Sequence, residues 1–225
     1  MEVLYEDNHI IAVYKPAGLL AQGDETGQQS LLEQVKKYLK EKHKKPGNVF
    51  LGVVHRLDRN VSGIILFGKT SKGASRLSEQ FRNHSIKKIY HAVVEGEMKN
   101  KRGKLVHYSK KDEVRKVAVV SDLPQEGYDQ MELDYEVLKS NKKYSLVKIN
   151  LKTGKFHQIR AQFSSIGHPI KGDAKYGFKT QNSKLKILGE IALCATEVEF
   201  ETATTGEVKN IKIDYPKEWG AYFGK

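Results

Sequence analysis

The sequence has 225 residues, 39% of them hydrophobic and 29% charged, so it can bury a core as one large domain or two small lobes. Its longest apolar runs, such as residues 63–67, are far shorter than the roughly 20 residues of a membrane-spanning helix, and its acidic start does not resemble a secretory signal. A single cysteine, Cys194, excludes an intrachain disulfide framework and a zinc site of several thiolates, and its apolar neighbours suggest that it is buried. We therefore expect a cytoplasmic protein.

The charge balance is strongly basic. Lys and Arg number 39 against 27 Asp and Glu, a formal net charge of +12. Such an excess favours a polyanionic partner, because neutralising phosphates releases condensed counterions. A charged surface that only serves solubility explains the excess equally well. If nucleic acid is the partner, the basic stretches 36–45 and 99–116 are the places where we expect phosphate contacts.

Short apolar segments, either continuous or alternating with polar residues, predict a chain dominated by strands. In chain order these segments are 10–14, 49–54, 63–67, 89–94, a basic hairpin within 99–120, 131–137, 147–151, 191–200 and 208–213. The first of them ends at Lys15-Pro16-Ala17-Gly18, which indicates a turn.

Three segments have helical spacing instead. The first follows Ser30 and Glu33, which form a capping-box pattern, the second spans 74–81, and the third spans 156–166 and would end at Gly167. Regular alternation of strand and helix is not visible. The sequence therefore predicts an α+β fold on a mixed, mostly antiparallel sheet with flanking helices. Residues 122–130, which contain a proline and a glycine, are the segment of the chain that most resembles a boundary between domains.

The densest group of chemically useful residues lies between two predicted strands, in segment 52–63. There Asp58 stands between Arg56 and Arg59, whose guanidinium groups would keep the carboxylate ionised, as a nucleophile or base requires. Loops at strand ends are also where rigid scaffolds present reactive groups. A surface ion-pair cluster in a turn explains the same residues, and taken alone it is the simpler interpretation.

A second segment, 151–160, combines a glycine turn with the start of a predicted helix. His157, Gln158 and Arg160 fall in the first turns of that helix, where they could meet a ligand. His157 and Gln158 could equally be buried polar groups that the backbone satisfies. Two glycine-containing stretches, 167–170 and 172–177, follow directly.

Several segments resemble, in the same order along the chain, the motifs of the RluA-type pseudouridine synthases. His55-Arg56-Leu57-Asp58, with Ser62-Gly63 beyond it, is similar to the catalytic motif of that family. The other similar segments are 5–19, 88–92, 153–160 and 166–170. One such motif would be moderate support, but several in the right order are specific, and they identify Asp58 as a catalytic residue.

The chain departs from the family pattern at Val61, Lys155 and Phe156, where threonine, arginine and threonine are common. These positions flank the chemistry, so they bear on the choice of RNA more than on activity. The resemblance implies the pseudouridine synthase fold as a single catalytic domain over 1–225, without an N-terminal S4 RNA-binding domain. It also implies a monomeric isomerase that converts uridine to pseudouridine in structured transfer or ribosomal RNA, without a cofactor or metal.

The resemblance implies a catalytic role for three residues. Asp58 would attack ribose C1′ or remove a proton from C2′, and the sequence does not choose between these routes. Arg160 would pair with Asp58 across the cleft and keep it charged and oriented. Tyr90 would pack against the base and help to remove the C5 proton.

Four further residues are implied to bind substrate. Arg56 would contact RNA near the vacated stack, since a uridine inside structured RNA must be flipped to be reached. Ile159 would form an apolar wall of the uracil pocket, although core packing explains it equally well. His55 and Lys88 complete the set, and an exposed strand lysine is the structural alternative for Lys88.

Two other functions compete with this interpretation. A catalytically inactive RNA-binding protein of the same fold would keep the basic charge, but the presence of Asp58, Tyr90 and Arg160 argues against it. A nucleic-acid glycosidase or hydrolase would also use a carboxylate at C1′, but that class typically needs a second carboxylate, and none recurs beside Asp58. The sequence does not identify the RNA or the uridine that is modified.

Overall fold

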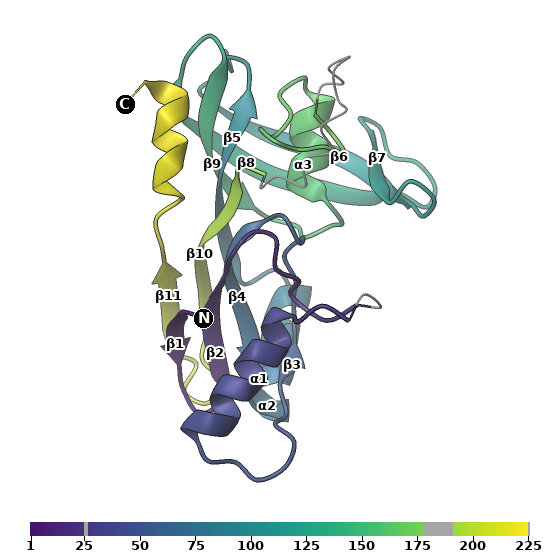
Figure 1. Ribbon diagram of the computed structural model, residues 1–225. Coiled ribbons are helices and arrows are strands. Elements are labelled where there is room, and N and C mark those ends of the chain that lie inside the picture. Colours follow the sequence, from purple (N-terminus) through teal and green to yellow (C-terminus); the bar gives the residue numbers. More distant parts are fainter. Residues whose placement is uncertain (25–26, 178–190, 225) are drawn as a thin grey trace. The chain divides into compact units, whose positions relative to one another are not determined.

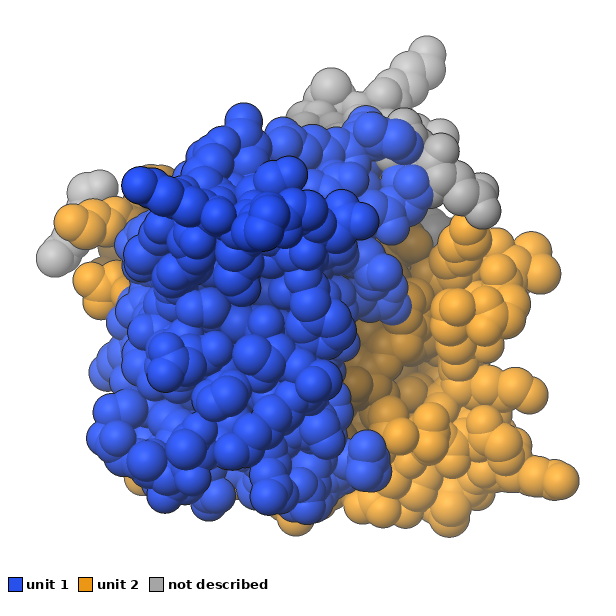
Figure 2. Space-filling view, turned by 90° about the horizontal axis from the view of Figure 1, so that it is seen from below, with its two compact units in different colours: residues 1–87, 195–213 blue, residues 88–194, 214–225 orange. Residues whose placement is uncertain are grey.

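The computed structural model describes residues 1–24, 27–177 and 191–224 (Figure 1). The chain divides into two compact units, coloured separately in Figure 2. Unit 1 comprises Met1–Lys87 and Ala195–Ile213, and unit 2 comprises Lys88–Cys194 and Asp214–Lys225. The expected boundary at 122–130 is wrong, since these residues lie inside unit 2. A single catalytic domain over 1–225 stays a prediction.

Unit 1 is built from antiparallel strand pairs and two helices. Its strands follow the order β1 (Val3–Glu6), β2 (Ile10–Lys15), β4 (Ser62–Gly68) and β10 (Leu193–Glu201). The short β3 (Gly52–Val53) pairs with β4, and β11 (Val208–Lys212) pairs with β10. The helices are α1 (Leu31–Lys42) and α2 (Ser71–Arg82). The first two residues of β10 belong to unit 2.

The start of α1 confirms the capping-box prediction. The Ser30 side chain accepts a hydrogen bond from the N–H of Glu33, and the Glu33 carboxylate accepts one of 2.8 Å from the N–H of Ser30. Such a cap typically contributes about 0.5–2 kcal/mol. The helix buries Leu31, Val35 and Leu39, which share one face at helical spacing.

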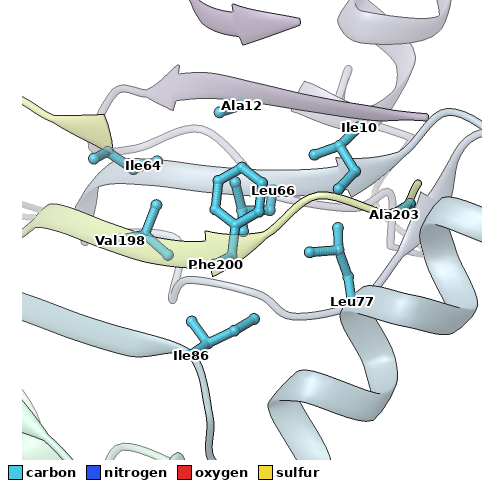
Figure 3. Packing of buried hydrophobic residues seen from close by; sticks show 9 residues of the cluster. All are labelled: Ile10, Ala12, Ile64, Leu66, Leu77, Ile86, Val198, Phe200 and Ala203. Carbon is cyan, nitrogen blue, oxygen red and sulfur yellow. The ribbon is translucent and has the colours of Figure 1, made fainter. Parts of the chain in front are cut away.

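Buried apolar side chains on one face of the unit 1 strands form a common core with α2 (Figure 3). Alternate residues of β2, β4 and β10 contribute to it, because side chains on a strand point to opposite faces in turn. The core residues are Ile10, Ala12, Ile64, Leu66, Leu77, Ile86, Val198, Phe200 and Ala203. The intervening residues Ile11, Val13, Ile65 and Phe67 are fully buried as well. Strands buried on both faces give the continuous apolar runs seen in the sequence.

Unit 2 is an antiparallel arrangement of longer strands with a helix and a 3-10 helix. The strand order is β5 (Lys87–Glu95), β9 (Tyr144–Leu151), β8 (Asp129–Ser140), β6 (Arg102–Asp112) and β7 (Val117–Ser121). The helix α3 (Gln158–Ser165) packs on β8 through Phe163 and Tyr135, whose rings meet edge to face at 5.9 Å. The 3-10 helix η1 (Lys217–Phe223) contacts β9 through Tyr144 and Tyr222.

Several predicted boundaries change in the structure. The predicted helix 156–166 begins only at Gln158, because His157 has a left-handed backbone with φ of 52° that no α-helix can include. The predicted strand 49–54 is reduced to two residues. The strand β1 and the 3-10 helix η1 were not predicted. Cys194 is buried, as expected.

None of the helices in the described ranges combines the length and the apolar composition that crossing a membrane requires. The α+β class and the mostly antiparallel strand pairing agree with the sequence-based prediction.

Candidate active site

Asp58 lies in a loop of unit 1 that leaves β3 and returns to β4. Its backbone carbonyl accepts a hydrogen bond of 3.0 Å from the N–H of Val61, which closes a turn. Leu57 is buried, whereas Arg56 is exposed and Asp58 is half-buried. Leu57 therefore anchors the loop while the two polar side chains stay accessible. A partly exposed carboxylate on a fixed turn is suited to act as a nucleophile or base.

A buried lysine at the end of β2 braces this loop. The Lys15 side chain is fully buried, and its ammonium donates hydrogen bonds to the backbone carbonyls of Pro16 at 3.1 Å, Leu19 at 2.7 Å and Arg59 at 2.9 Å. Burial lowers the pKa of Lys15 to about 8, against the opposing effect of the Asp58 charge. Lys15 thus ties the residue after Asp58 to the turn after β2. Its role was missed in the sequence, although a lysine that ends an apolar strand before a proline turn was a visible signal.

The guanidinium group of Arg59 also serves the structure of the loop. Its Nε donates to the Gly18 carbonyl at 3.0 Å, and its Nη2 donates to Gln28 Oε1 at 2.9 Å. In return, the N–H of Gly18 donates to the Arg59 carbonyl at 2.8 Å. The sequence indicated Arg59 only as a neighbouring charge for Asp58, and these longer-range contacts were not visible in it.

His55 is held at the start of the loop by β4 and α2. The backbone N–H of Leu66 donates to His55 Nε2 at 2.9 Å, so Nε2 is the acceptor and the neutral ring carries its proton on Nδ1. The imidazole also stacks on Phe81, with ring centroids 4.5 Å apart. These contacts give His55 a structural task, and its contact with substrate stays a prediction.

Gly63 allows a very close approach of β4 to β10 directly after the loop. Its φ is 123°, and a Cβ at this position would lie 2.3 Å from the carbonyl oxygen of Ala195. In the register of β2 and β4, Gly63 pairs with Lys15. The position therefore requires glycine, both for its backbone conformation and for space.

A buried amide holds the turn that leads into α3 in unit 2. Gln158 Oε1 accepts hydrogen bonds from the hydroxyl of Thr153 at 2.8 Å and the N–H of Lys155 at 3.0 Å. Its Nε2 donates to the Glu132 carbonyl at 3.1 Å and to Gln162 Oε1 at 3.0 Å. Gln158 is therefore the buried, satisfied polar group that the sequence allowed as an alternative to a ligand contact.

Arg160, in the first turn of α3, is buried against an aspartate. Its Nε donates to Asp173 Oδ2 at 2.6 Å and its Nη2 donates to Oδ1 at 2.9 Å. The same Oδ1 accepts the N–H groups of Lys175 at 2.9 Å and Tyr176 at 3.2 Å. Burial alone would raise the pKa of Asp173, but the hydrogen bonds and charge of Arg160 outweigh it and hold that pKa below its usual range.

An aromatic ring covers the same guanidinium group. The ring centroid of Tyr176 lies 5.2 Å from Arg160 Cζ, a distance at which a cation and an aromatic face attract. The Tyr176 hydroxyl accepts the N–H of Ala118 on β7 at 2.6 Å and hydrogen-bonds to His157 Nδ1 at 2.9 Å. The start of α3 is thus connected to β7 around Arg160.

The remaining predicted residues also lie in unit 2. Tyr90 is half-buried on β5, and Lys88 shares its face by strand alternation. Lys88 is buried, so the alternative of an exposed strand lysine is wrong, and burial lowers its pKa. Its Nζ is 3.8 Å from the position that a Cβ on Gly154 would take. Ile159 is 5% exposed, which is consistent with core packing and with an apolar pocket wall.

The predicted site residues fall into two groups. Unit 1 places three of them on one loop, His55, Arg56 and Asp58, and unit 2 places four on β5 and α3, Lys88, Tyr90, Ile159 and Arg160. The pairing of Arg160 with Asp58 stays a prediction. Among residues 1–24, 27–177 and 191–224, no three His, Cys, Asp or Glu side chains are grouped to hold a metal ion. The expectation of metal-free activity stays a prediction.

Known sequences similar to this chain share one activity in their names. The profile of the family described as RNA pseudouridylate synthase matches residues 9–165, more than half of the chain. The tRNA pseudouridine synthase C of Yersinia pestis is 32% identical over 97% of this chain and 88% of that protein. The ribosomal large subunit pseudouridine synthase C of Buchnera aphidicola subsp. Schizaphis graminum is 29% identical over 93% of this chain and 65% of that protein.

A solved structure has the same fold. The human protein described as RNA pseudouridylate synthase domain containing 4 matches with a TM-score of 0.77 over 97% of this chain and 90% of that chain. The two sequences are 22% identical, so this likeness shows the fold alone. It confirms the pseudouridine synthase fold expected from the sequence.

Proposed function

This chain belongs to the RNA pseudouridylate synthase family and is an RNA pseudouridine synthase, an isomerase, and from that premise we propose that Asp58 carries the reaction. The observation that supports this role is the placement of Asp58. Its half-buried carboxylate lies on a turn that is anchored by the buried Leu57. The Lys15 ammonium also holds this turn, through a hydrogen bond to the Arg59 carbonyl. Rigid presentation of an accessible acid is what covalent or general-base catalysis needs.

The reaction exchanges one glycosidic bond for another. The bond between ribose C1′ and uracil N1 breaks, the base turns, C1′ bonds to C5, and the proton on C5 leaves while N1 gains one. Oxidation states do not change overall and water is not consumed. Asp58 either attacks C1′ or takes the C2′ proton to give a glycal, and both routes require its ionised form.

Arg160 and Tyr90 are the proposed partners of Asp58 in the reaction. The guanidinium group of Arg160 would pair with the Asp58 carboxylate and keep it charged. Tyr90, half-buried on β5, would pack against the uracil and assist loss of the C5 proton. Ile159, buried on α3, would supply an apolar wall beside the base.

Three residues are proposed to act on the RNA around the target. Arg56 is exposed beside Asp58 and would contact the strand from which the uridine has been flipped. His55 would line the substrate site from its fixed position against β4. Lys88, with its ammonium near Gly154, would bring a positive charge to the turn before α3.

The proposed substrates are uridines in transfer RNA or ribosomal RNA. Two relatives are named for these two classes of RNA, and the net charge of +12 suits either of them. An inactive RNA-binding protein and a base-releasing hydrolase are the alternatives, and tritium release, free uracil and RNA binding measured together separate all three.

The test is Asp58→Asn assayed by tritium release from RNA labelled at uracil C5. Only replacement of the C5–H bond releases that label, so the assay reports isomerisation rather than base loss. The probes are transfer-RNA and large-subunit ribosomal-RNA transcripts free of pseudouridine. Asn is nearly isosteric with Asp but offers no carboxylate, so we expect a folded variant that binds RNA and releases essentially no tritium.

The matched control is Asp134→Asn, which removes an exposed carboxylate on β8 that pairs with Lys152, the residue after β9. This variant should release tritium like the wild type. Release by Asp58→Asn at a rate near wild type would contradict the proposed role of Asp58. Free uracil from the wild type would indicate a hydrolase, and RNA binding without either product would indicate an inactive RNA-binding protein.

A further inference from the structure

We propose that Asp173 is a positioning residue that fixes the guanidinium group of Arg160 in the orientation needed to serve Asp58. The inference rests on the proposed function, because it acts through the role given there to Arg160. It starts from the two parallel hydrogen bonds of 2.6 and 2.9 Å that join the two side chains. The side chain of Asp173 is 0% exposed and that of Arg160 is 8% exposed.

A bidentate contact fixes more than a distance. Two parallel N–H···O bonds set the plane of the guanidinium group, so the side chain of Arg160 cannot turn about its last bonds without breaking one of them. The contact uses the Nε–H and one Nη2–H, two of the five N–H donors of the group. The remaining donors then have a defined direction, which is the property that pairing with a second carboxylate requires.

Asp173 can act as a fixed point because its own position is determined by the backbone. Oδ1 accepts the N–H groups of Lys175 and Tyr176, which are two and three residues further along. The N–H of Gly177 donates to the Asp173 carbonyl at 2.8 Å, and a Cβ on Gly177 would lie 2.4 Å from that oxygen. The compact turn therefore holds the carboxylate before any substrate arrives.

Tyr176 limits movement of the Arg160 guanidinium group towards the face of its ring. Its ring lies 5.2 Å from Arg160 Cζ, and its hydroxyl is tied to Ala118 of β7 and to His157. An isolated buried cation is costly, so the Asp173 charge also allows Arg160 to stay buried in the enzyme without RNA. The turn at 173–177 thus supplies both the negative charge that balances Arg160 and the aromatic ring that covers it.

A purely structural ion pair between α3 and the turn is the competing explanation, and a double-mutant cycle separates the two. The cycle uses Asp173→Asn, Arg160→Lys and the double variant, each assayed on the transcript that the wild type converts fastest. If Asp173 acts through Arg160, Asp173→Asn should lower kcat about 10–100-fold and change KM less than about threefold. In the Arg160→Lys background the same substitution should change kcat by less than about threefold, because the bidentate contact is already lost.

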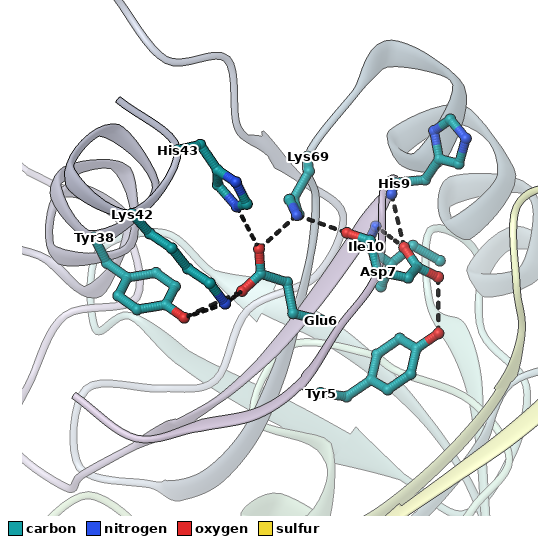
Figure 4. A network of polar contacts seen from close by, with 9 residues as sticks. All are labelled: Tyr5, Glu6, Asp7, His9, Ile10, Tyr38, Lys42, His43 and Lys69. Atoms are coloured by element: carbon teal, nitrogen blue, oxygen red, sulfur yellow. Dashed lines mark hydrogen bonds and ion pairs between the residues drawn. The ribbon is translucent and has the colours of Figure 1, made fainter. Parts of the chain in front are cut away.

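Glu6→Gln is the matched control, because it breaks another largely buried ion pair at a distance in sequence from the site. Glu6 accepts a hydrogen bond of 2.6 Å from Lys69 in unit 1, and their side chains are 10% and 7% exposed (Figure 4). This variant should lose stability but keep the kcat of the wild type. All variants are compared at a temperature where their melting curves show a folded protein.

Two results would overturn the inference while leaving Asp58 as the catalyst. One is a kcat of Asp173→Asn near wild type, which a purely structural pair predicts. The other is an equal loss of kcat in both backgrounds, which would show that Asp173 acts independently of Arg160. Should Asp173→Asn not fold, Asp173→Glu keeps the charge, displaces the carboxylate and takes its place in the cycle. Failure of both variants to fold would show that the Asp173 carboxylate is required for folding, and this result would also overturn the inference. A failure of the proposed function is distinct, because Asp58→Asn would then release tritium at a rate near that of the wild type.

Discussion

Glu6 is the acceptor at the centre of a polar network that joins β1, α1 and the end of β4 (Figure 4). It accepts hydrogen bonds from Lys69 at 2.6 Å, His43 at 2.8 Å and Lys42 at 2.9 Å. Burial alone would raise the pKa of Glu6, but these hydrogen bonds outweigh it and lower the pKa from 4.5 to about 2. A carboxyl group whose pKa is lower in the folded protein stabilises the fold only while it is ionised.

The pH dependence of Glu6→Gln follows from that shift. Above pH 4.5 the wild type should exceed the variant by about 1–3 kcal/mol in free energy of unfolding, the range for hydrogen bonds to a charged group. As the pH falls from 4.5 towards 2, the advantage should shrink, because the unfolded chain binds a proton at Glu6 before the folded chain does. Urea unfolding at a series of pH values measures it.

Glu79→Gln controls for removal of a carboxylate that is simply paired on the surface. Glu79 contacts Arg76 in an exposed pair on α2, with side chains 55% and 60% exposed. Such pairs contribute little, so this variant should stay within about 0.5 kcal/mol of wild type, with no comparable change across the same window. A wild-type advantage over Glu6→Gln that is constant from pH 7 to the acid limit would contradict the lowered pKa.

At the scale of single residues, the sequence indicated candidate reactive side chains, but it did not indicate the residues that hold them in place. Asp58 could be proposed as the catalytic residue because its neighbours in the chain form a local pattern. Lys15 and Asp173 could not be assigned roles, because their partners are backbone carbonyls or a guanidinium group that folding brings near. Gln158 remained ambiguous for the same reason, since its four hydrogen bonds join residues as distant as Glu132.

At the scale of elements, the local patterns predicted most strands and helices of the described chain, and the pairing of distant ones was not predictable. The α1 helix followed from its capping box and its apolar face. The place of β10 beside β4 did not, because more than a hundred residues separate them in the chain. Gly63 marks that pairing, yet in the sequence it is only a glycine after the segment that carries Asp58.

Gly63→Ala should therefore damage the sheet of unit 1. A methyl group would overlap the backbone of Ala195, and φ of 123° is strained for alanine, so we expect a loss of about 2–4 kcal/mol in free energy of unfolding. Because Gly63 pairs with Lys15, kcat should also fall at temperatures where the variant is folded. Urea unfolding and tritium release measure the two effects.

Gly23→Ala is the matched control for that substitution. A Cβ on Gly23 would meet nothing within 4 Å, and its backbone does not need a positive φ. Its stability should stay within about 0.5 kcal/mol of wild type. A Gly63→Ala variant as stable and active as Gly23→Ala would show that the two strands separate without cost and that the loop does not depend on their contact.

At the scale of the whole molecule, charge is the property that the sequence predicts most directly, because it does not depend on how the chain folds. The structure adds which charges face solvent. Several basic residues of the second basic stretch, 99–116, are exposed but already paired with acidic neighbours, as Lys111 is with Glu113 and Arg102 with Glu136. Lys110 is also exposed, on β6, and it is a sharper test of a phosphate contact.

RNA binding should depend steeply on salt. Each phosphate contact releases counterions, so the logarithm of the association constant should fall by about 0.7–0.9 per contact for each unit of log salt. Lys110→Gln should reduce that slope by about 1 and weaken binding similarly for unrelated RNA sequences, because a phosphate contact carries no sequence information. Arg76→Gln, an exposed change on α2, is the control for loss of one positive charge anywhere on the surface. Filter binding of a transfer-RNA transcript over a range of KCl concentrations measures the slopes.

An affinity that hardly changes with salt would contradict the basic-surface interpretation. Equal slopes for Lys110→Gln and Arg76→Gln would instead show that total charge, and not the β6 surface, attracts the RNA.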